Sequence, residues 1–497
     1  MRWRPIIALD TVIDPKSRIV SVILGVYFRN APIATMNRKQ LKSLANWLDG
    51  ADRKPLIIRG ARQIGKSTLV RLFAEQRQRP LAEVNLERYP ELNTVFEAMN
   101  PQQILNQLEA LPNMPAIAAD SLLFLDEIQA APAAIAALRY FYEERRDLPV
   151  ISAGSLMEFA LSEKRLSMPV GRIQYLHMGP MTFTEYLEAL GENKLKEVVE
   201  SYAFGAELGP VVHKRLLDLL RSYYFVGGMP GAVSVYARSR KFSDVGSVHN
   251  SIIETYREDF QKYAPSRNMV RMQHVLNFVA RNVGTKIKYA NVLKDVHSST
   301  IRQDIDLLSM ARVISKVVHT HASGLPLQAN LDEKVYKLLF LDVGLMNAIC
   351  GLGWKTLSKL DDLQLVNEGA VAKQFIGQHL QELLAERPNR ELTYWLREGR
   401  SSNAEVDFVL AFEGQIVPIE VKAGGRGSLR SLHQFVGEKH APLAVRFDSN
   451  PPSMQTVSAT IQTGGRAADV KYRLLSLPLY LVEKFADVVR DLSSEAT

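Results

Sequence analysis

The segment Gly60-Ala61-Arg62-Gln63-Ile64-Gly65-Lys66-Ser67 constrains this chain more than any other part of its sequence. It lies between a short apolar run and a helical segment, and its spacing is that of a phosphate-binding loop, G-x-x-x-x-G-K-S. Such a loop brings backbone N–H groups, a lysine ammonium and a serine hydroxyl to a nucleotide phosphate and Mg²⁺. Taken alone, the motif could also be an ordinary glycine turn. We expect ATP and Mg²⁺ to bind here, through Gly60, Gln63, Gly65, Lys66, Ser67 and Thr68.

Two acidic residues end another apolar run. The run Leu122–Leu125 places Asp126 at the carboxyl end of a buried strand, where its carboxylate can hold the water shell of Mg²⁺. Glu127 follows and is the candidate base for the water that attacks the phosphate. An acidic pair in this position could otherwise cap a helix. Together with the phosphate-binding loop, the pair favours nucleotide hydrolysis.

The region from Pro55 to Pro180 alternates short apolar runs with helical or loop segments, which predicts a parallel α/β sheet. The expected strands are Leu56–Arg59, Leu81–Leu86, Leu122–Asp126, Val150–Ala153 and Ile173–His177.

Three further residues near this sheet are candidates for the nucleotide site, Ser155 for binding the nucleotide and Arg172 for catalysis. Ser152 and Ser155 lie at the exit of the fourth expected strand, where a hydroxyl could touch the γ-phosphate, or they are ordinary turn serines. Arg172 is the candidate transition-state arginine, acting within the chain or across a subunit boundary. A surface arginine explains Arg172 equally well.

A second candidate site lies near the carboxyl end. The segments Glu405–Leu410 and Pro418–Lys422 predict a hairpin, and strand alternation places Asp407, Glu420 and Lys422 on its polar face. Asp407 and Glu420 could bind Mg²⁺ or Mn²⁺ while Lys422 orients a water for phosphodiester cleavage. Glu368 begins a helical stripe of apolar residues and is a fourth candidate catalytic group. An amphipathic hairpin with solvated charges is the alternative.

The remaining segments divide the chain into expected domains. Residues 1–35 are an N-terminal extension, 36–180 a P-loop ATPase core and 181–264 a helical lid, because apolar residues take a helical spacing after Thr182. Residues 265–325 have the pattern of a winged helix, with helices, a Ser298-Ser299-Thr300 cap and a strand at Val313-Ile314. Residues 326–497 alternate strands and helices in a separate α/β domain.

Composition limits the classes of protein to be considered. The 497 residues carry 61 Lys and Arg against 53 Asp and Glu, and this net charge of +8 permits contact with DNA without requiring it. The single cysteine, Cys350, excludes a disulfide framework and a Cys-based zinc site. The apolar stretch Ile19–Phe28 is too short to span a bilayer. We expect a cytoplasmic protein without a membrane partner.

An ordered series of segments resembles a widespread prokaryotic family of AAA-type ATPases with a C-terminal PD-(D/E)xK nuclease-like domain. The segments are Gly60–Ser67, Leu122–Gln129, Gly179–Tyr186, Gly227–Pro230, Lys337–Gly344 and Ile419–Gly424. The resemblance implies a P-loop AAA-type parallel α/β core with a helical lid, a winged helix and a restriction-endonuclease-like α/β domain. It also implies ATP hydrolysis at Lys66, Ser67, Asp126 and Glu127, and assembly into a homo-oligomer.

Two functions fit these predictions. The first is a Mg²⁺-dependent AAA-type ATPase that acts on DNA and cuts it at a metal-dependent C-terminal nuclease site. The second is a nucleotide-dependent switch that binds DNA or protein and has a non-catalytic nuclease-like domain. Arg302, Arg312, Lys286 and Lys288 are the candidate DNA contacts of the winged helix in either case.

Overall fold

The computed structural model describes residues 37–154, 168–263, 268–352, 368–385, 387, 391–398, 403–424, 427–463 and 466–494. These residues belong to one compact unit, Asn37–Thr497. The predicted N-terminal extension, residues 1–35, and the candidate Ser155 lie outside them.

In the described part of the chain, five strands form one parallel sheet in the order β2-β3-β4-β1-β5. The predicted strands are confirmed to within about one residue at each end. The three inner strands, β1, β3 and β4, are buried almost throughout, as a parallel sheet covered on both faces requires, whereas the outer strands β2 and β5 are only partly buried. The strands are β1 (Leu56–Arg59), β2 (Leu81–Asn85), β3 (Leu122–Asp126), β4 (Val150–Gly154) and β5 (Gln174–His177).

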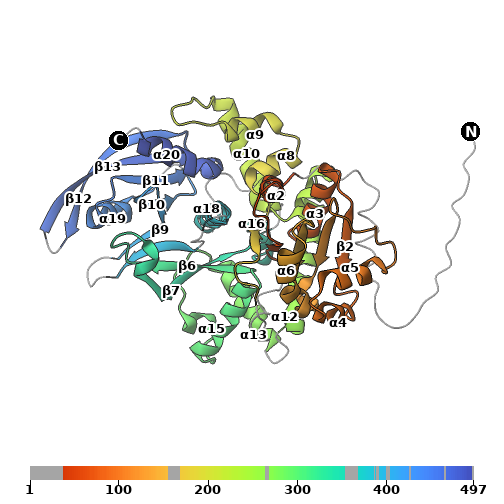
Figure 1. Ribbon diagram of the computed structural model, residues 1–497. Helices are drawn as coiled ribbons and strands as arrows, with labels where there is room; N and C mark the ends of the chain where they lie inside the picture. Colours follow the sequence, from red (N-terminus) through yellow and green to blue (C-terminus); the bar gives the residue numbers. More distant parts are fainter. Residues whose placement is uncertain are drawn as a thin grey trace, which may run out of the picture. The chain divides into compact units, whose positions relative to one another are not determined.

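Helices connect β1 to β2, β2 to β3 and β3 to β4, as parallel pairing requires. Leu123, Leu125 and Phe141 belong to the apolar core that the sheet and helices share. The helices of this region are α2 (Gln40–Leu48), α3 (Lys66–Gln76), α4 (Leu92–Glu97), α5 (Pro101–Glu109) and α6 (Pro132–Glu144), with a short 3₁₀ turn, η1 (Ile128–Ala130). Figure 1 shows them packed around the sheet.

The predicted helical region follows the sheet. Its helices are α8 (Phe183–Ala189), α9 (Asn193–Glu200), α10 (Pro210–Val226), α11 (Pro230–Ser239) and α12 (Phe242–Tyr263). Thr182 and Glu185 form a capping box at the start of α8. The break between α10 and α11 needs glycine, because Gly227 has a φ of +70° and a Cβ there would lie 2.1 Å from the Asp342 side chain.

Three helices and an antiparallel strand pair come next. They are α13 (Met269–Arg281), α14 (Tyr289–Val292), α15 (Ser298–Met310), β6 (Ile314–Thr320) and β7 (Leu331–Phe340), with η2 (Leu327–Asn330) between the strands. The predicted cap residues Ser298-Ser299-Thr300 form the first turn of α15, and His297 stands at the N-cap position without a side-chain hydrogen bond. The strand expected at Val313-Ile314 corresponds to the start of the longer β6 at Ile314.

A mixed sheet contains the eight remaining strands that the described residues form, in the order β12-β13-β11-β10-β9-β8-β6-β7. The pair β6 and β7 belongs to it, because β6 pairs in parallel with β8. The predicted domain boundary at residues 325 and 326 thus falls between two paired strands of one sheet. The other strands are β8 (Leu392–Arg397), β9 (Ala404–Phe412), β10 (Gln415–Val421), β11 (Leu443–Asp448), β12 (Ser453–Thr463) and β13 (Arg466–Pro478).

One central helix, α18 (Glu368–Leu384), packs on β7 and β10 of this sheet (Figure 1). The predicted apolar stripe of α18 is buried, and Gln374 donates to and accepts from the backbone of Phe340 in β7. The remaining elements are α16 (Val343–Ile349), α19 (Arg430–Lys439), η3 (Leu479–Lys484) and α20 (Phe485–Ser494). Across the described ranges, no helix combines the length and apolarity needed to cross a membrane.

Candidate functional site

The phosphate-binding loop joins β1 to the N-terminus of α3. Gly65 caps this helix with a φ of +88°, a conformation that favours glycine. Gly60 has no room for a side chain, since a Cβ would lie 2.2 Å from the carbonyl oxygen of Met178. The buried Lys66 ammonium donates to the carbonyl oxygens of Gly60 (3.1 Å) and Ala61 (2.8 Å). The loop therefore holds an ammonium beside a helix N-terminus, which is the arrangement of a phosphate site.

The acidic pair lies next to this loop. Ser67 Oγ donates to Asp126 Oδ2 at 2.7 Å, and Asp126 is 8% exposed. Burial raises the pKa of Asp126; the hydrogen bond from Ser67 opposes this, and the nearby Glu127 carboxylate raises the pKa further. A hydroxyl and a carboxylate held together are hard oxygen donors, and Mg²⁺ needs few protein ligands because it keeps several waters. These residues fit Mg²⁺ bound together with a nucleotide.

Glu127 has a strained backbone and an oriented carboxylate. Its φ is +51°, which is uncommon for a residue with a side chain, and strain of this kind concentrates at functional sites. Gln129 Nε2 donates to Glu127 Oε2 at 2.6 Å. The Gln129 side chain in turn packs against Gly154 at the end of β4. A side chain at Gly154 would clash with Gln129, because its Cβ would lie 2.4 Å from Gln129 Oε1. Glu127 is thus held in one position at the edge of the sheet.

Helix α12 contacts the phosphate-binding loop from one side. The Arg62 guanidinium forms an ion pair with Asp259 at 2.7 Å, and Gln63 Nε2 donates to Thr255 Oγ1 at 3.1 Å. Tyr256 donates through its hydroxyl to the Arg62 carbonyl oxygen at 2.8 Å. Gln63, expected to contact ATP, therefore also joins the loop to α12.

Arg38 holds the same loop from another side. Its guanidinium donates to the carbonyl oxygens of Ile64 (3.0 Å) and Gly179 (2.8 Å), and pairs with Glu185 at 3.1 Å. Arg38 and Glu185 are both buried. Sequence reasoning missed Arg38, which belongs to no motif and lies far from its partners along the chain.

The structure does not bring all the predicted residues to this site. Ser152 is buried and donates to the Leu56 carbonyl oxygen at 3.3 Å, a contact between neighbouring strands. Arg172 pairs with Glu143 at 3.3 Å. It lies just before β5, whereas the phosphate-binding loop comes just after β1, and these two strands run parallel. Arg172 therefore lies at the opposite end of the sheet from Lys66 within one chain. Thr68 is in the first turn of α3.

The predicted hairpin of the second site is confirmed as β9 and β10. The pairing of Ile419 with Phe408 places Glu420 opposite Asp407. Asp407 Oδ2 accepts from the Val421 N–H at 2.9 Å, and Lys422 Nζ lies 2.6 Å from Glu420 Oε1. Asp407, Glu420 and Lys422 thus do converge. Burial and the nearby Asp407 raise the pKa of Glu420 to about 7, despite the opposing effect of Lys422.

Among the described side chains of α18, that of Lys373 reaches this cluster, although no sequence motif marks it. Its Nζ lies 2.6 Å from Asp407 Oδ1. Burial lowers the pKa of Lys373, but Asp407, Glu405 and Glu420 outweigh it and leave the pKa raised. The predicted Glu368 is the first residue of α18, and its side chain lies outside the described structure.

A second lysine lies close to the same hairpin. Lys337 of β7 is 2% exposed, forms an ion pair with Glu405 and lies over the ring of Tyr394 at 4.4 Å from its centroid. Burial lowers the pKa of Lys337, although Asp407 and Glu405 act in the opposite direction.

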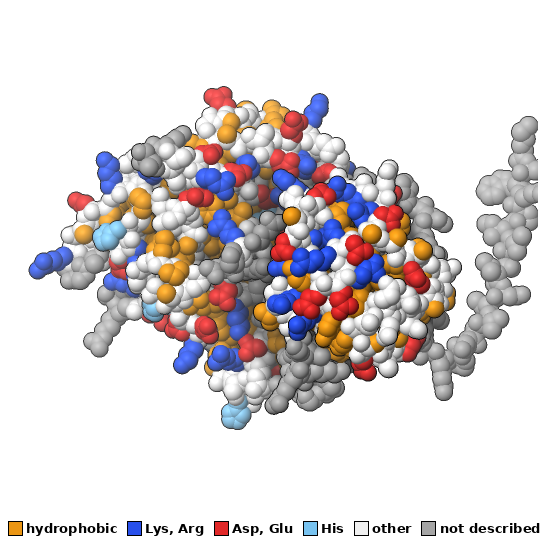
Figure 2. Space-filling view, viewed as in Figure 1, with side chains coloured by type: hydrophobic (Ala, Val, Ile, Leu, Met, Phe, Trp, Pro, Cys, Tyr) orange, Lys and Arg blue, Asp and Glu red, His pale blue; other side chains and the backbone are white. Residues whose placement is uncertain are grey.

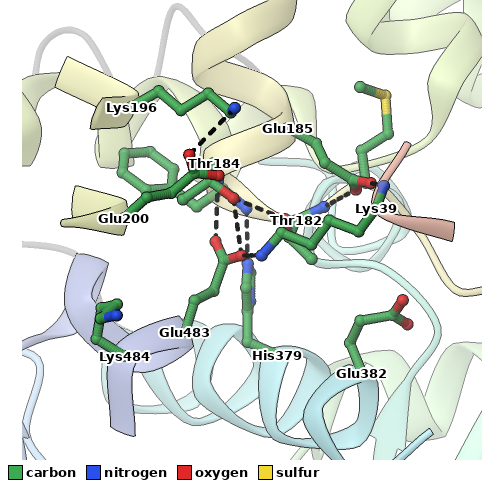
Figure 3. A network of polar contacts seen from close by, with 12 residues as sticks. Lys39, Thr182, Thr184, Glu185, Lys196, Glu200, His379, Glu382, Glu483 and Lys484 are labelled. Carbon is green, nitrogen blue, oxygen red and sulfur yellow. Dashed lines mark hydrogen bonds and ion pairs between the residues drawn. The ribbon is translucent and has the colours of Figure 1, made fainter. Parts of the chain in front are cut away.

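A polar network joins α8 to the C-terminal region (Figure 3). Glu483 of η3 accepts from the backbone N–H (2.9 Å) and the hydroxyl (2.8 Å) of Thr184, and also pairs with Lys39. His379 of α18 accepts through Nε2 from the Phe183 N–H at 2.9 Å. These groups satisfy N–H groups at the start of α8, which would otherwise be buried without partners.

The candidate DNA contacts differ in their surroundings. Lys288 and Arg302 are exposed, whereas Lys286 pairs with Glu398 at 2.7 Å. Arg312 has a φ of +57° at the turn between α15 and β6. Figure 2 shows Lys and Arg interspersed with Asp and Glu over the face in view, so basic charge on this face is not gathered into one large area.

Family models match three parts of the chain. Residues 52–187 match a family described as AAA domain, which agrees with the phosphate-binding loop and the parallel sheet. Residues 217–356 and 368–455 match two domains of unknown function, DUF8612 and DUF4143. No curated protein matches the chain.

Several solved structures show a distant likeness. The Aeropyrum pernix ORC1 protein in complex with DNA is 15% identical, with 63% of this chain and 91% of that chain covered and a TM-score of 0.26. The Aeropyrum pernix ORC2 protein is 13% identical, with 67% and 98% covered and a TM-score of 0.31. The Thermotoga maritima RuvB Holliday junction branch migration motor is 16% identical, with 56% and 90% covered and a TM-score of 0.27. At these TM-scores the likenesses assign neither a fold nor a function.

Proposed function

We propose that the chain is a Mg²⁺-dependent ATPase whose active site is built from Lys66, Ser67, Asp126 and Glu127. The observation that carries this proposal is the contact of Ser67 with Asp126, next to a helix N-terminus that holds a buried lysine. Lys66 and Ser67 thus meet Asp126, which lies 59 residues after Ser67 in the chain, at the carboxyl edge of one sheet. The AAA domain match over residues 52–187 supports the same activity.

The residues have separate roles in hydrolysis. The Lys66 ammonium, now bonded to loop carbonyl oxygens, would turn to the more strongly charged β- and γ-phosphate oxygens. Ser67 and Asp126 would hold Mg²⁺, which neutralises charge that develops on the phosphates. Glu127 would accept a proton from the attacking water, in the orientation that Gln129 gives its carboxylate.

Variants of these residues test the proposal. K66A should abolish ATP turnover and weaken ATP binding, because it removes the charge that meets the phosphates. E127Q should retain ATP binding and lower turnover by about 10²- to 10⁴-fold, the usual contribution of a general base. Binding of a fluorescent ATP analogue and phosphate release measure the two effects separately.

The matched controls are K42A and E207Q, since Lys42 and Glu207 are exposed. Both controls should leave binding and turnover unchanged. Normal turnover in K66A would show that ATP is not hydrolysed at this site. Normal turnover in E127Q would show that another group accepts the proton.

The second part of the proposal is a nucleotide-dependent switch that binds DNA. Helices α13–α15 followed by the β6–β7 pair have the element order of a winged helix, and Lys288 and Arg302 are exposed there. Because α12 contacts the phosphate-binding loop, a change in the loop on nucleotide binding can move the helical region. Assembly into a homo-oligomer, which could place Arg172 at a neighbour's nucleotide, belongs to the same proposal.

The nuclease hypothesis is the second candidate for the C-terminal domain. It is favoured by the convergence of Asp407, Glu420 and Lys422 on one face of the β9–β10 hairpin. Of the two functions, we favour the switch, because Lys373 occupies a carboxylate oxygen that a metal would need.

A further inference from the structure

The cluster on the β9–β10 hairpin balances its charges internally. Among the described residues, its carboxylates are Glu405, Asp407 and Glu420, and each pairs with an ammonium, from Lys337, Lys373 and Lys422 respectively. The Asp407 carboxylate is 5% exposed and that of Glu420 is 9% exposed. Buried charges of this kind are stable only when they are paired.

The carboxylate oxygens leave little room for a divalent cation. Asp407 Oδ1 is bound by Lys373 at 2.6 Å, and Asp407 Oδ2 accepts from the Val421 N–H at 2.9 Å. Glu420 Oε1 is bound by Lys422, and only Glu420 Oε2 is buried without a partner. A cation bound at Asp407 would therefore have to displace the Lys373 ammonium or the Val421 N–H.

Lys373 also excludes a cation by its charge. An ammonium 2.6 Å from Asp407 already supplies the positive charge that the carboxylate needs. A metal ion bound at the same carboxylate would face this ammonium at short range, and like charges in a poorly solvated site repel strongly. The expected metal ligands Asp407 and Glu420 are thus each already paired with an ammonium, and the partner of Asp407, Lys373, comes from α18.

We propose that the Lys373 ammonium takes the place of a divalent cation at Asp407, so that the β9–β10 cluster is a metal-independent ion-pair site and the C-terminal sheet is a binding module that does not cleave phosphodiesters. This inference deepens the switch function proposed above and is independent of ATP hydrolysis. Lys373 is therefore the residue that determines whether the cluster binds a metal ion.

A charge reversal at Lys373 tests the proposal. K373E places a third carboxylate beside Asp407 and Glu420, so the nucleotide-free full-length chain should gain one Mn²⁺ site, detected by loss of the free Mn²⁺ signal in electron paramagnetic resonance. The double variant K373E/D407N should lose the site again. Wild type and D407N should give the same titration, because Asp407 binds no metal when Lys373 is present.

A second readout follows stability. Mn²⁺ should raise the thermal midpoint of K373E and leave that of wild type unchanged, since a ligand stabilises only the folded state that binds it. ATP turnover of K373E, measured with Mg²⁺, should stay within about twofold of wild type and shows that the chain is folded. K373M, which removes the ammonium without adding a carboxylate, replaces K373E if that variant does not fold; its midpoint should fall and recover with Mn²⁺.

Three results would overturn the proposal. One is Mn²⁺ binding by wild type that D407N abolishes. Another is Mg²⁺- or Mn²⁺-dependent cleavage of single-stranded, duplex or branched DNA by wild type that D407N abolishes. The third is the lack of an Asp407-dependent Mn²⁺ site in both K373E and K373M. Because ATP turnover is measured separately through K66A, failure here is distinguishable from failure of the ATPase proposal.

Discussion

Glu483 shows how one buried carboxylate can hold distant segments together. Its side chain is 8% exposed and meets Lys39 from the N-terminal side of the core and Thr184 from the start of α8. Burial alone would raise the pKa of Glu483. The Lys39 charge, with the hydrogen bonds from Lys39 and Thr184, outweighs burial and lowers the pKa to about 2.

This pKa predicts a pH-dependent contribution to stability. An acid with a lowered pKa in the folded state stabilises it above the pKa of the unfolded chain, near 4.5, and loses this contribution as the pH falls toward 2. E483Q should therefore destabilise the protein by about 1 to 3 kcal/mol at pH 7, allowing for the partial exposure of Lys39. Thermal midpoints of wild type and E483Q should differ at pH 7 and approach each other between pH 4 and 3.

The exposed residue Glu207 supplies the control for this prediction. E207Q should shift the midpoint by less than E483Q at every pH. A difference between wild type and E483Q that stays constant from pH 7 to pH 3 would mean that the carboxylate charge of Glu483 does not stabilise the fold.

The sequence predicts some of these residues and misses others for a physical reason. Lys66, Ser67, Asp126 and Glu127 lie in short motifs whose spacing alone dictates their geometry. Lys373, by contrast, meets Asp407 only because α18 packs on a sheet formed by distant strands. The cue available in the sequence was a lysine within a helical segment that is otherwise largely apolar, which requires a buried partner.

At the scale of elements, helix α12 of the helical region contacts the phosphate-binding loop directly. Arg62 pairs with Asp259, and Gln63 and the Arg62 carbonyl oxygen bind Thr255 and Tyr256. A change in the loop upon nucleotide binding must alter these contacts or carry α12 with it.

A double-mutant cycle on the Arg62–Asp259 pair tests this coupling. R62A and D259N should each weaken nucleotide binding by about three- to tenfold, and R62A/D259N should be no weaker than either alone, because both remove one interaction. The corresponding coupling energy is about 1 kcal/mol, measured by titration of a fluorescent ATP analogue. Additive effects in the double variant would show that the ion pair does not transmit to the nucleotide site.

Local patterns predict elements better than they predict how elements pair. The inner strands of the parallel sheet are predicted correctly because each is a short apolar run next to a loop or helix signal. The assignment of β6 to the C-terminal sheet depends on its pairing with β8, in which Val317 faces Leu392. Nothing in the local sequence of β6 specifies a partner so far along the chain.

At the scale of the whole molecule, the net charge of +8 gives a testable consequence for DNA binding. Each phosphate neutralised by a basic side chain contributes about −0.9 to the slope of log K against log salt concentration. K288A/R302A should therefore make the slope shallower by about 1.8 if both residues contact phosphates. Fluorescence anisotropy of labelled duplex DNA at several salt concentrations measures it.

K42A, on the exposed face of α2, is the control for non-specific loss of charge and should leave the slope unchanged. Binding that does not vary with salt, or a slope that K288A/R302A does not alter, would indicate that helices α13–α15 bind protein and not DNA.

The continuity of the mixed sheet across residues 325 and 326 determines where the chain can be cut. A fragment starting at residue 326 would lack β6, so β7 would have no neighbour and β8 would become an outer strand with unsatisfied N–H and C=O groups. Such exposed strand edges recruit other chains and promote aggregation. A fragment that begins before α13 retains β6, which pairs with both β7 and β8. It should remain monodisperse under conditions in which the shorter fragment precipitates.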